Sequence, residues 1–415
     1  MTTVMNILFV TEYFPPKIMG GGEINVSILA KALANNGMDV QVLTSYHQGL
    51  QKYELVDKVK VHRTLATADN PHGIRNNLKR SWSFPGSVVR EVRKIVTERK
   101  IEAIHFIGAS IIAAPKLKHL NIPLFATIES FPTLCPKGDR IYHGKEECKV
   151  VCTFSKFVSC QRNSAEIGKI ENKFYLKYNP VSLSYVYTYY KKLNEGMKYC
   201  NLIAISEYVK ELLAQQGLKS TVIPNALDVG RYYQNQSKSS LLGKVKVLYL
   251  GSLTTYKGPQ VVLKALQGLQ NYHCDLYGDG PLQEELQKMI KDNNLAAEIH
   301  KPVPYTKIPE LYASVDIIVL PSIWPEPFGR IAIEAMAAGR PVIGSDIGAI
   351  KELIADGAGI LVKPGDIKGF HNALAELIND KKKREKMGEI GRIAAANYDE
   401  QLVMMKFKTL YQGVQ

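Results

Sequence analysis

Short apolar runs alternate along the chain with segments whose apolar residues recur at helical spacing. NILFVTEYFP (6–15) has the pattern of a buried strand, and GGEINVSILAKALANNG (21–37) has that of a helix ending on a glycine. MDVQVLTS (38–45), AIHFIG (103–108) and PLFATIE (123–129) follow as further short strands. This order predicts an α/β fold in which parallel sheets carry helices on both faces.

The alternation begins again with LIAIS (202–206), and a chain of 415 residues exceeds one ordinary core. We therefore expect two doubly wound domains that face each other across a deep cleft. The predicted parts are an N-terminal domain at 1–228, a C-terminal domain at 229–390, and a terminal helix at 391–415 that packs back on the first domain. Residues 132–193 fit the alternation least well and indicate an insertion on the first domain.

The positive charge of the chain is concentrated in its first half. The net charge is +14, and residues 1–228 hold 30 basic and 19 acidic side chains. Such a surface attracts anionic membranes, nucleic acid or phosphorylated substrates, although lysines scattered over the surface would give the same total. No apolar run reaches the roughly 18 residues of a membrane span. The first apolar run is too short for a signal sequence, so we expect a cytoplasmic protein.

Four of the six cysteines lie close together, within the expected insertion. They are Cys135, Cys148, Cys152 and Cys160. Disulfides are rare in the cytoplasm, so this cluster suggests a structural zinc site. The spacings match no standard zinc signature, and unpaired surface thiols are the alternative.

Glycine-rich and basic loops follow two of the expected strands, where ligands bind in open parallel sheets. The first loop contains Gly20, Gly21 and Gly22 ahead of a helix, which permits close backbone approach and offers free N–H groups to a phosphate or sugar. The second places Lys257 just before Gly258 and a helix start, where its charge suits a diphosphate.

Two glutamates flank a third helix start, in the segment PEPFGRIAIEAMAAGRPVIGSD (325–346). Glu326 lies in the loop after a strand, the helix is expected to begin near Gly329, and Glu334 follows one turn into it. A carboxylate accepts hydrogen bonds from vicinal hydroxyls, while the helix start favours an anion. The alternative is that a negative charge near the N-terminus only stabilises the helix, which would explain the presence of Glu326 but not that of Glu334.

This segment resembles the signature of glycosyltransferase family 4, the retaining nucleotide-sugar transferases with the GT-B fold of two Rossmann-like domains. The two glutamates match the Glu-x7-Glu element of the family. GSLTTYKG (251–258), AISEYVKELL (204–213), VIPNALD (222–228) and YGDGPLQEEL (277–286) stand in the expected order. The resemblance covers most of the chain.

The resemblance implies a role for each residue of these motifs. Glu334 would hold the ribose of a UDP- or GDP-sugar, and Glu326 would contact the sugar. Lys257 and the backbone around Phe328, Gly329, Arg330 and Ile331 would hold the diphosphate, with Gly21 and Gly22 approaching from the other domain. The base would lie near HKPVP (300–304). Catalysis would need no metal cofactor, because lysine and helix dipoles stabilise the leaving charge.

Two positions depart from the family pattern. Ser252 stands where an arginine usually contacts the diphosphate, a loss for which Arg330 could compensate. Glu129 stands where many members carry a histidine beside the reacting sugar, and it is expected to contact the acceptor. The residues expected to take part in catalysis are therefore Glu326, Lys257 and Glu129.

Three other activities compete with a glycosyltransferase. A glycoside hydrolase also uses two carboxylates, but the phosphate-binding elements would then have no purpose. A nucleotide epimerase of similar fold does not match the Glu-x7-Glu signature. A non-catalytic nucleotide-sugar-binding protein on the GT-B scaffold is compatible with Ser252 and Glu129.

Residues 76–100 suggest where the acceptor is found. Trp82 and Phe84 precede a helix with an apolar side, and basic residues such as Arg93 and Lys94 line the remainder. This pattern suits an enzyme attached to the inner face of an anionic membrane, with a lipid-linked or glycan acceptor and no nucleic acid partner. A core helix with a solvated basic face is the alternative.

Overall fold

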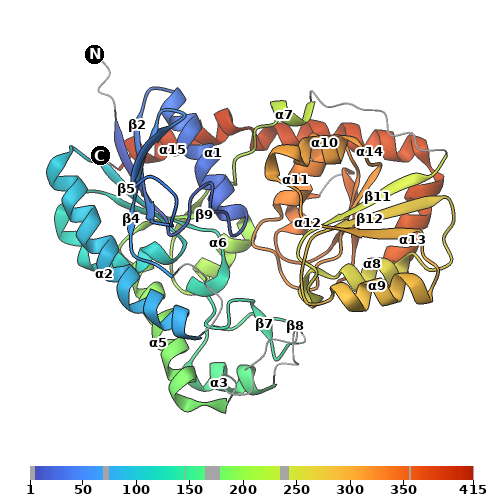
Figure 1. The fold of residues 1–415 in the computed structure, drawn as a ribbon, viewed down its shortest axis with the longest axis horizontal. Helices are drawn as coiled ribbons and strands as arrows, with labels where there is room; N and C mark the ends of the chain where they lie inside the picture. Colours follow the sequence, from blue (N-terminus) through green and yellow to red (C-terminus); the bar gives the residue numbers. More distant parts are fainter. Residues whose placement is uncertain are drawn as a thin grey trace.

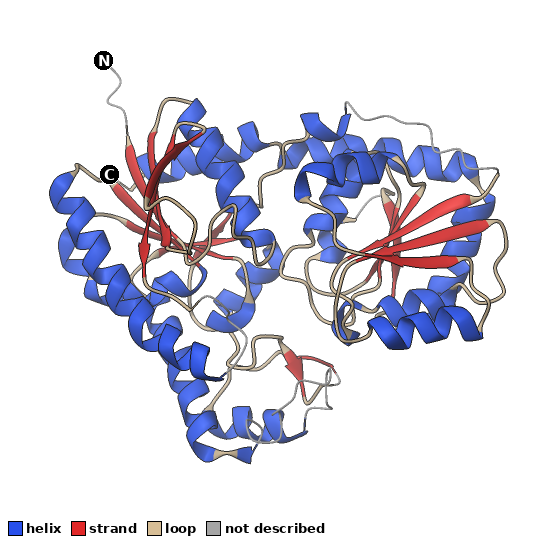
Figure 2. Cartoon of the chain, in the orientation of Figure 1, coloured by secondary structure: helices blue, strands red, loops and turns tan. Residues whose placement is uncertain are grey.

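The computed structural model describes residues 5–68, 74–144, 146–163, 178–233, 243–354 and 357–414. The chain forms two domains, each built around its own sheet, which lie side by side (Figure 1). Helices cover both faces of each sheet (Figure 2). The predicted fold class of two doubly wound domains is confirmed.

The first domain contains an eight-stranded sheet in the order β10-β9-β6-β5-β1-β2-β4-β3. All its pairs are parallel except β3 with β4. The strands are β1 (Asn6–Val10), β2 (Asp39–Ser45), β3 (Tyr53–Val56), β4 (Val59–Leu65), β5 (Ala103–Ile107), β6 (Leu124–Ile128), β9 (Asn201–Ala204) and β10 (Ser220–Val222).

Alternate residues of β1 point to opposite faces of this sheet, and both faces are packed. Ile7 and Phe9 join a core with α1 (Gly21–Asn35) and α15 (Glu400–Gln412). Leu8 and Val10 join the other core. The other core is covered by α2 (Ile74–Glu98), η1 (Gly108–Lys116), α5 (Pro180–Met197) and α6 (Glu207–Ala214). Burial on both faces explains why the strands read as continuous apolar runs.

The second domain contains a six-stranded parallel sheet in the order β13-β12-β11-β14-β15-β16. The strands are β11 (Val245–Leu250), β12 (Tyr272–Tyr277), β13 (Ala297–His300), β14 (Ile317–Leu320), β15 (Val342–Ser345) and β16 (Gly359–Val362). The helices are α7 (Gly230–Tyr233), α8 (Pro259–Ala265), α9 (Gln283–Asp292), α10 (Ile308–Ala313), α11 (Arg330–Ala337), α12 (Ile350–Leu353), α13 (Ile367–Asn379) and α14 (Lys381–Ala395).

The chain passes between the domains at two places that are bonded to each other. The N–H of Leu227 donates to the carbonyl of Tyr398 at 2.8 Å, and the N–H of Glu400 donates to the carbonyl of Leu227 at 2.9 Å. Beyond this crossing, α15 packs on α1 of the first domain. The hydroxyl of Tyr411 lies 2.6 Å from Nδ1 of the buried His105, which ties the terminal helix to β5. The terminal helix therefore returns to the first domain, as expected.

The expected insertion contains two different parts. Its first part holds η3 (Phe131–Thr133), the small hairpin of β7 (Ile141–Tyr142) and β8 (Glu146–Glu147), and α3 (Phe154–Asn163). It projects from the first domain below the sheet in Figure 1. Its last part is α5, which buries Leu193 and Met197 in the main core. Helix α5 is thus an integral layer of the domain.

Helix α2 is a core helix. Val88, Val92 and Ile95 pack in the interior, and Phe84 is 1% exposed. The apolar side of this helix is consequently unavailable to a membrane, and only Trp82, at 81% exposure, remains on the surface from the expected aromatic entry. Among the described residues, none of the helices combines the length and apolarity that crossing a membrane requires.

Candidate active site

The residues predicted to bind the donor line one cavity of about 650 Å³ between the two domains. The lining residues include Gly21, Gly22, Glu129, Ser252, Lys257, Glu326, Phe328, Gly329, Arg330, Ile331 and Glu334. Loops after β1, β6, β11 and β14 contribute most of them. The carboxyl ends of the strands from both sheets therefore face this cavity, where ligands bind in such folds.

The glycine loop brings the first domain against the second. A β-carbon built on Gly22 would lie 2.5 Å from Oε2 of Glu129, so no larger residue fits there without a shift. A β-carbon on Gly21 would only touch the Arg330 side chain, at 3.8 Å. Gly22 is therefore required by the close approach of α1 to Glu129.

Glu129 follows β6 and lies in the floor of the cavity on the side of the first domain. Asn25 donates to its Oε1 at 2.8 Å, and the carbonyl oxygen of the same amide accepts from the N–H of Ala226 at 2.9 Å. Burial, together with the nearby negative charge of Glu23, raises the pKa of Glu129 to about 8. Glu129 is thus largely protonated at neutral pH and can donate a hydrogen bond.

Glu326 lies at the centre of a cluster of donors after β14. Lys257 Nζ at 2.6 Å, Ser322 Oγ at 2.8 Å and Trp324 Nε1 at 3.0 Å all donate to its Oε1. The ammonium of Lys257 also lies 4.9 Å from the centre of the Trp324 ring. The ion pair holds Lys257 at the cavity wall, and a carboxylate with one oxygen so engaged retains acceptor capacity on the other.

Glu334 is buried on α11 with donors that the sequence did not predict. Its Oε1 accepts from Arg330 Nε at 2.9 Å and from Tyr305 at 3.3 Å, and its Oε2 accepts from Tyr312 at 3.2 Å. Burial raises the pKa of Glu334, while the Arg330 charge opposes that rise. The two tyrosines lie more than twenty positions before Glu334, so no local pattern connects them to it.

Arg330 is the first residue of α11, and each of its three guanidinium nitrogens has a hydrogen-bond partner. Its Nη1 donates to the carbonyl of Ala226 at 3.1 Å, and its Nη2 donates to Tyr305 at 2.7 Å. In this arrangement it serves Glu334 and the interdomain crossing, and its side chain also lines the cavity. The preceding Gly329 has φ of 110°, which turns the chain into the helix.

Two glycine loops meet beside Ser252 at the ends of β11 and β12. A β-carbon on Gly278 would lie 1.9 Å from the carbonyl oxygen of Gly251, and Leu253 N–H donates to the carbonyl of Asp279 at 2.7 Å. Asp279 and Tyr277 line the cavity here, although they were not among the predicted site residues. This compact wall leaves room for a ligand next to Ser252.

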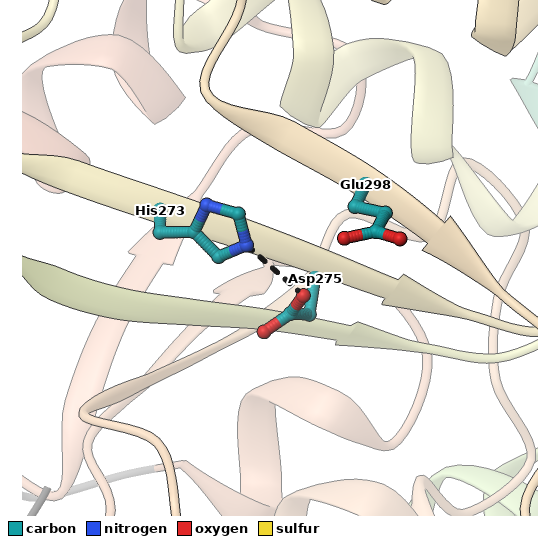
Figure 3. Close-up of side chains that lie close together, drawn as sticks. All are labelled: His273, Asp275 and Glu298. Carbon is teal, nitrogen blue, oxygen red and sulfur yellow. Dashed lines mark ion pairs between the residues drawn. The ribbon is translucent and has the colours of Figure 1, made fainter. Parts of the chain in front are cut away.

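The part of the cavity near HKPVP includes Pro302 and Val303. The ring of His300 stacks on Tyr277, with centroids 4.5 Å apart, and Nε2 of His300 lies 2.7 Å from Asp275. Asp275 also pairs with His273 at 3.2 Å, next to Glu298 (Figure 3). Asp275 therefore orients the ring of His300, which in turn supports the ring of Tyr277 at the cavity wall.

The four clustered cysteines line a second, much smaller cavity in the insertion. All six cysteines of the chain are described, and each is a thiol. Burial, together with the negative charges of the other three thiolates, raises the pKa of Cys152 to about 12. The sulfurs of the cluster therefore lie close enough to repel one another when ionised.

Two α/β domains around such a cavity form the GT-B fold. A sucrose-phosphate synthase from Thermosynechococcus elongatus has this fold, with a TM-score of 0.75 and 19% identity over 99% of both chains. HepE from Anabaena in complex with UDP and glucose has a TM-score of 0.69 and 19% identity, covering 98% of this chain and 99% of that one.

The family follows from the sequence matches. The family model of Glycosyltransferase Family 4 matches residues 19–231, and the model of Glycosyl transferases group 1 matches residues 234–394. The chain belongs to glycosyltransferase family 4. It is also similar to an uncharacterized glycosyltransferase of Methanocaldococcus jannaschii, with 25% identity over 382 residues, 84% of this chain and 83% of that protein.

Proposed function

We propose that this protein is a retaining, metal-independent glycosyltransferase that uses a nucleotide-diphosphate sugar. The observation that carries the proposal is the convergence of Lys257 and the start of α11 on one side of the cavity, with Glu129 on the other. A cation and a helix N-terminus suit a diphosphate, whose negative charge increases as the glycosidic bond to the sugar breaks.

The donor is proposed to lie along the second domain. Glu334 would hold the ribose hydroxyls, with Tyr305 and Tyr312 fixing its carboxylate. Glu326 would accept from a sugar hydroxyl through the oxygen that Lys257 does not engage. The UDP and UDP-glucose complexes of the structurally similar HepE favour a UDP-sugar, and a GDP-sugar is the other candidate.

Glu129 is proposed to act from the side of the first domain. Because its pKa is about 8, it would donate a hydrogen bond to a hydroxyl of the donor sugar or the acceptor. The acceptor proton would then pass to the departing diphosphate, which leaves on the same face of the sugar and so retains the anomeric configuration. Glu129 would orient the sugar without removing a proton itself.

The proposed acceptor is a glycan or a lipid-linked sugar, made available at the cytoplasmic face of a membrane. The positive charge of residues 1–228 and the exposed Trp82 support this choice. The pathway would then be the synthesis of a surface polysaccharide or glycolipid. Sedimentation with anionic and neutral vesicles tests membrane attachment, which is excluded if both kinds of vesicle bind equally little protein.

A transferase assay tests the central proposal. Purified protein with UDP-glucose or GDP-mannose should release the nucleotide diphosphate in the presence of a mixture of sugar acceptors, and the product anomer should match that of the donor by NMR. Glu326→Gln should abolish this release. Nucleotide binding without release, unchanged by any acceptor tested, would favour the non-catalytic binding protein to which Ser252 and Glu129 point.

A further inference from the structure

The insertion of the first domain contains four thiols around one small cavity. Cys135, Cys148, Cys152 and Cys160 all line it, and its volume of about 20 Å³ accommodates a single water or ion. We propose that these four cysteines bind one zinc-like divalent ion in tetrahedral coordination. Four thiolates are a ligand set that zinc takes in structural sites.

A buried arginine provides independent support for an anionic group in this cavity. Arg140 lines the cavity, is 2% exposed, and has no hydrogen-bond partner on its Nε and Nη2 atoms. Its Nη1 donates to the carbonyl of Val150 at 3.5 Å, and leaving the other two nitrogens without a partner is costly in the interior of a protein. Four thiolates around a divalent cation form a centre with excess negative charge, which Arg140, with Lys137 and Lys156 at the cavity edge, would balance.

The backbone around the cavity donates to one of the sulfurs. The N–H of His143, in the hairpin turn, donates to Cys160 Sγ at 3.4 Å. This bond places the sulfur of Cys160 beside the turn of the hairpin.

The metal would join three separate parts of the insertion. Cys135 follows η3, Cys148 follows β8, and Cys160 belongs to α3. Within the described residues, His273, Asp275 and Glu298 bring their ligand atoms within 4.8 Å of one another. No three cysteines of the described chain have their sulfurs this close together. Binding must therefore draw the sulfurs inward, because Zn–S bonds of about 2.3 Å place tetrahedral sulfurs about 3.8 Å apart.

The position of the site suggests what it stabilises. Asp139 lies between Cys135 and Cys148, pairs with Lys137 at 3.2 Å, and accepts from the hydroxyl of Tyr256 at 3.4 Å. Tyr256 precedes Lys257 in the second domain. The metal centre would thus be structural and would hold the loop that meets the donor domain beside the diphosphate-binding lysine.

Elemental analysis tests this proposal without an activity assay. Full-length protein purified under reducing conditions without chelator should carry about one zinc per chain, released when a mercurial reagent blocks the thiols. Metal-stripped protein should bind one Co²⁺ and show the intense thiolate-to-cobalt absorption of a tetrahedral site. These two measurements on the unaltered chain do not depend on any variant folding.

Matched variants then assign the ligands. Cys152→Ser and Cys160→Ser should lose most of the bound metal, while Cys200→Ser, a half-buried cysteine outside the cluster, should retain it. Zinc-free protein that takes up no Co²⁺ and has freely titratable cluster thiols would overturn the proposal. Several irons per chain, with the visible absorption of a cluster, would overturn the single-ion assignment.

Discussion

Substituting Lys257 by methionine isolates the contribution of one charge to donor binding. Methionine keeps the apolar stem and removes the ammonium that lies 2.6 Å from Glu326. Ser322 and Trp324 still donate to the same carboxylate oxygen, and the lysine side chain is 31% exposed. The free energy of unfolding should therefore fall by no more than about 1 kcal/mol, as for a partly exposed ion pair.

The loss for a bound diphosphate should be larger than this. A hydrogen bond to a charged group contributes about 1.5–3 kcal/mol, and partial exposure favours a value of about 2 kcal/mol, or roughly 30-fold in Kd. Calorimetric titration should show that loss for UDP, or for GDP if that is the nucleotide bound, and less than about 2-fold for the nucleoside. The larger loss is expected only where a diphosphate is present.

The exposed Lys264 on the next helix provides the matched control. Lys264→Met removes the same charge from the same domain and should leave both affinities unchanged. Equal losses for the diphosphate and the nucleoside in Lys257→Met would show that the lysine only shapes the wall of the cavity. An unchanged diphosphate affinity would refute its assignment altogether.

Three further predictions concern the same cavity. Glu129→Gln mimics the protonated acid. Because the folded-state pKa of Glu129 is raised to about 8, the unaltered protein should lose stability relative to this variant as pH rises from about 4 to about 8, and should lose no more above pH 8. Urea unfolding at a series of pH values measures this difference in the free energy of unfolding. A stability difference that does not vary with pH would contradict the raised pKa. Gly22→Ala should strongly reduce glycosyl transfer, because its β-carbon would lie 2.5 Å from Glu129. Gly20→Ala, whose β-carbon has its nearest neighbour at 3.9 Å, should remain active. Equal transfer activities of the two variants would refute the close approach. Glu334→Ala removes the partner of the buried Arg330 and should lower the free energy of unfolding by about 3–5 kcal/mol, and a loss below about 1 kcal/mol would show that the tyrosines compensate.

The sequence predicted best those features that depend on local patterns. Strands such as β1 and β14 are buried on both faces, so they read as apolar runs, and α11 begins one residue after the predicted Gly329. The cavity residues could be anticipated because parallel strands place their following loops at one edge. Their roles in binding remain predictions.

Features that depend on tertiary contacts were beyond the sequence. Tyr312 reaches Glu334 only because α10 packs beside α11, and neither helix carries a sign of that pairing. Helix α2 shows a similar limit: an amphipathic pattern is the same whether its apolar side meets a membrane or a core, and the buried Phe84 decides for the core. The sequence did not predict that α5 packs in the core, because the hydroxyl groups of its many tyrosines make its apolar side look polar.

The paired crossing at Leu227 and Tyr398 has a mechanical consequence. The two segments bonded to each other at this crossing join the domains, which also meet where Ser206 Oγ donates to the carbonyl of Pro327 at 2.7 Å. Helix α15, anchored through Tyr411 to His105, fixes the far end of the second segment to the first domain (Figure 1). Arg330 reaches the same crossing through the carbonyl of Ala226. We therefore expect a ligand that shifts Arg330 to change the angle between the two domains, and small-angle scattering with and without UDP would measure that change.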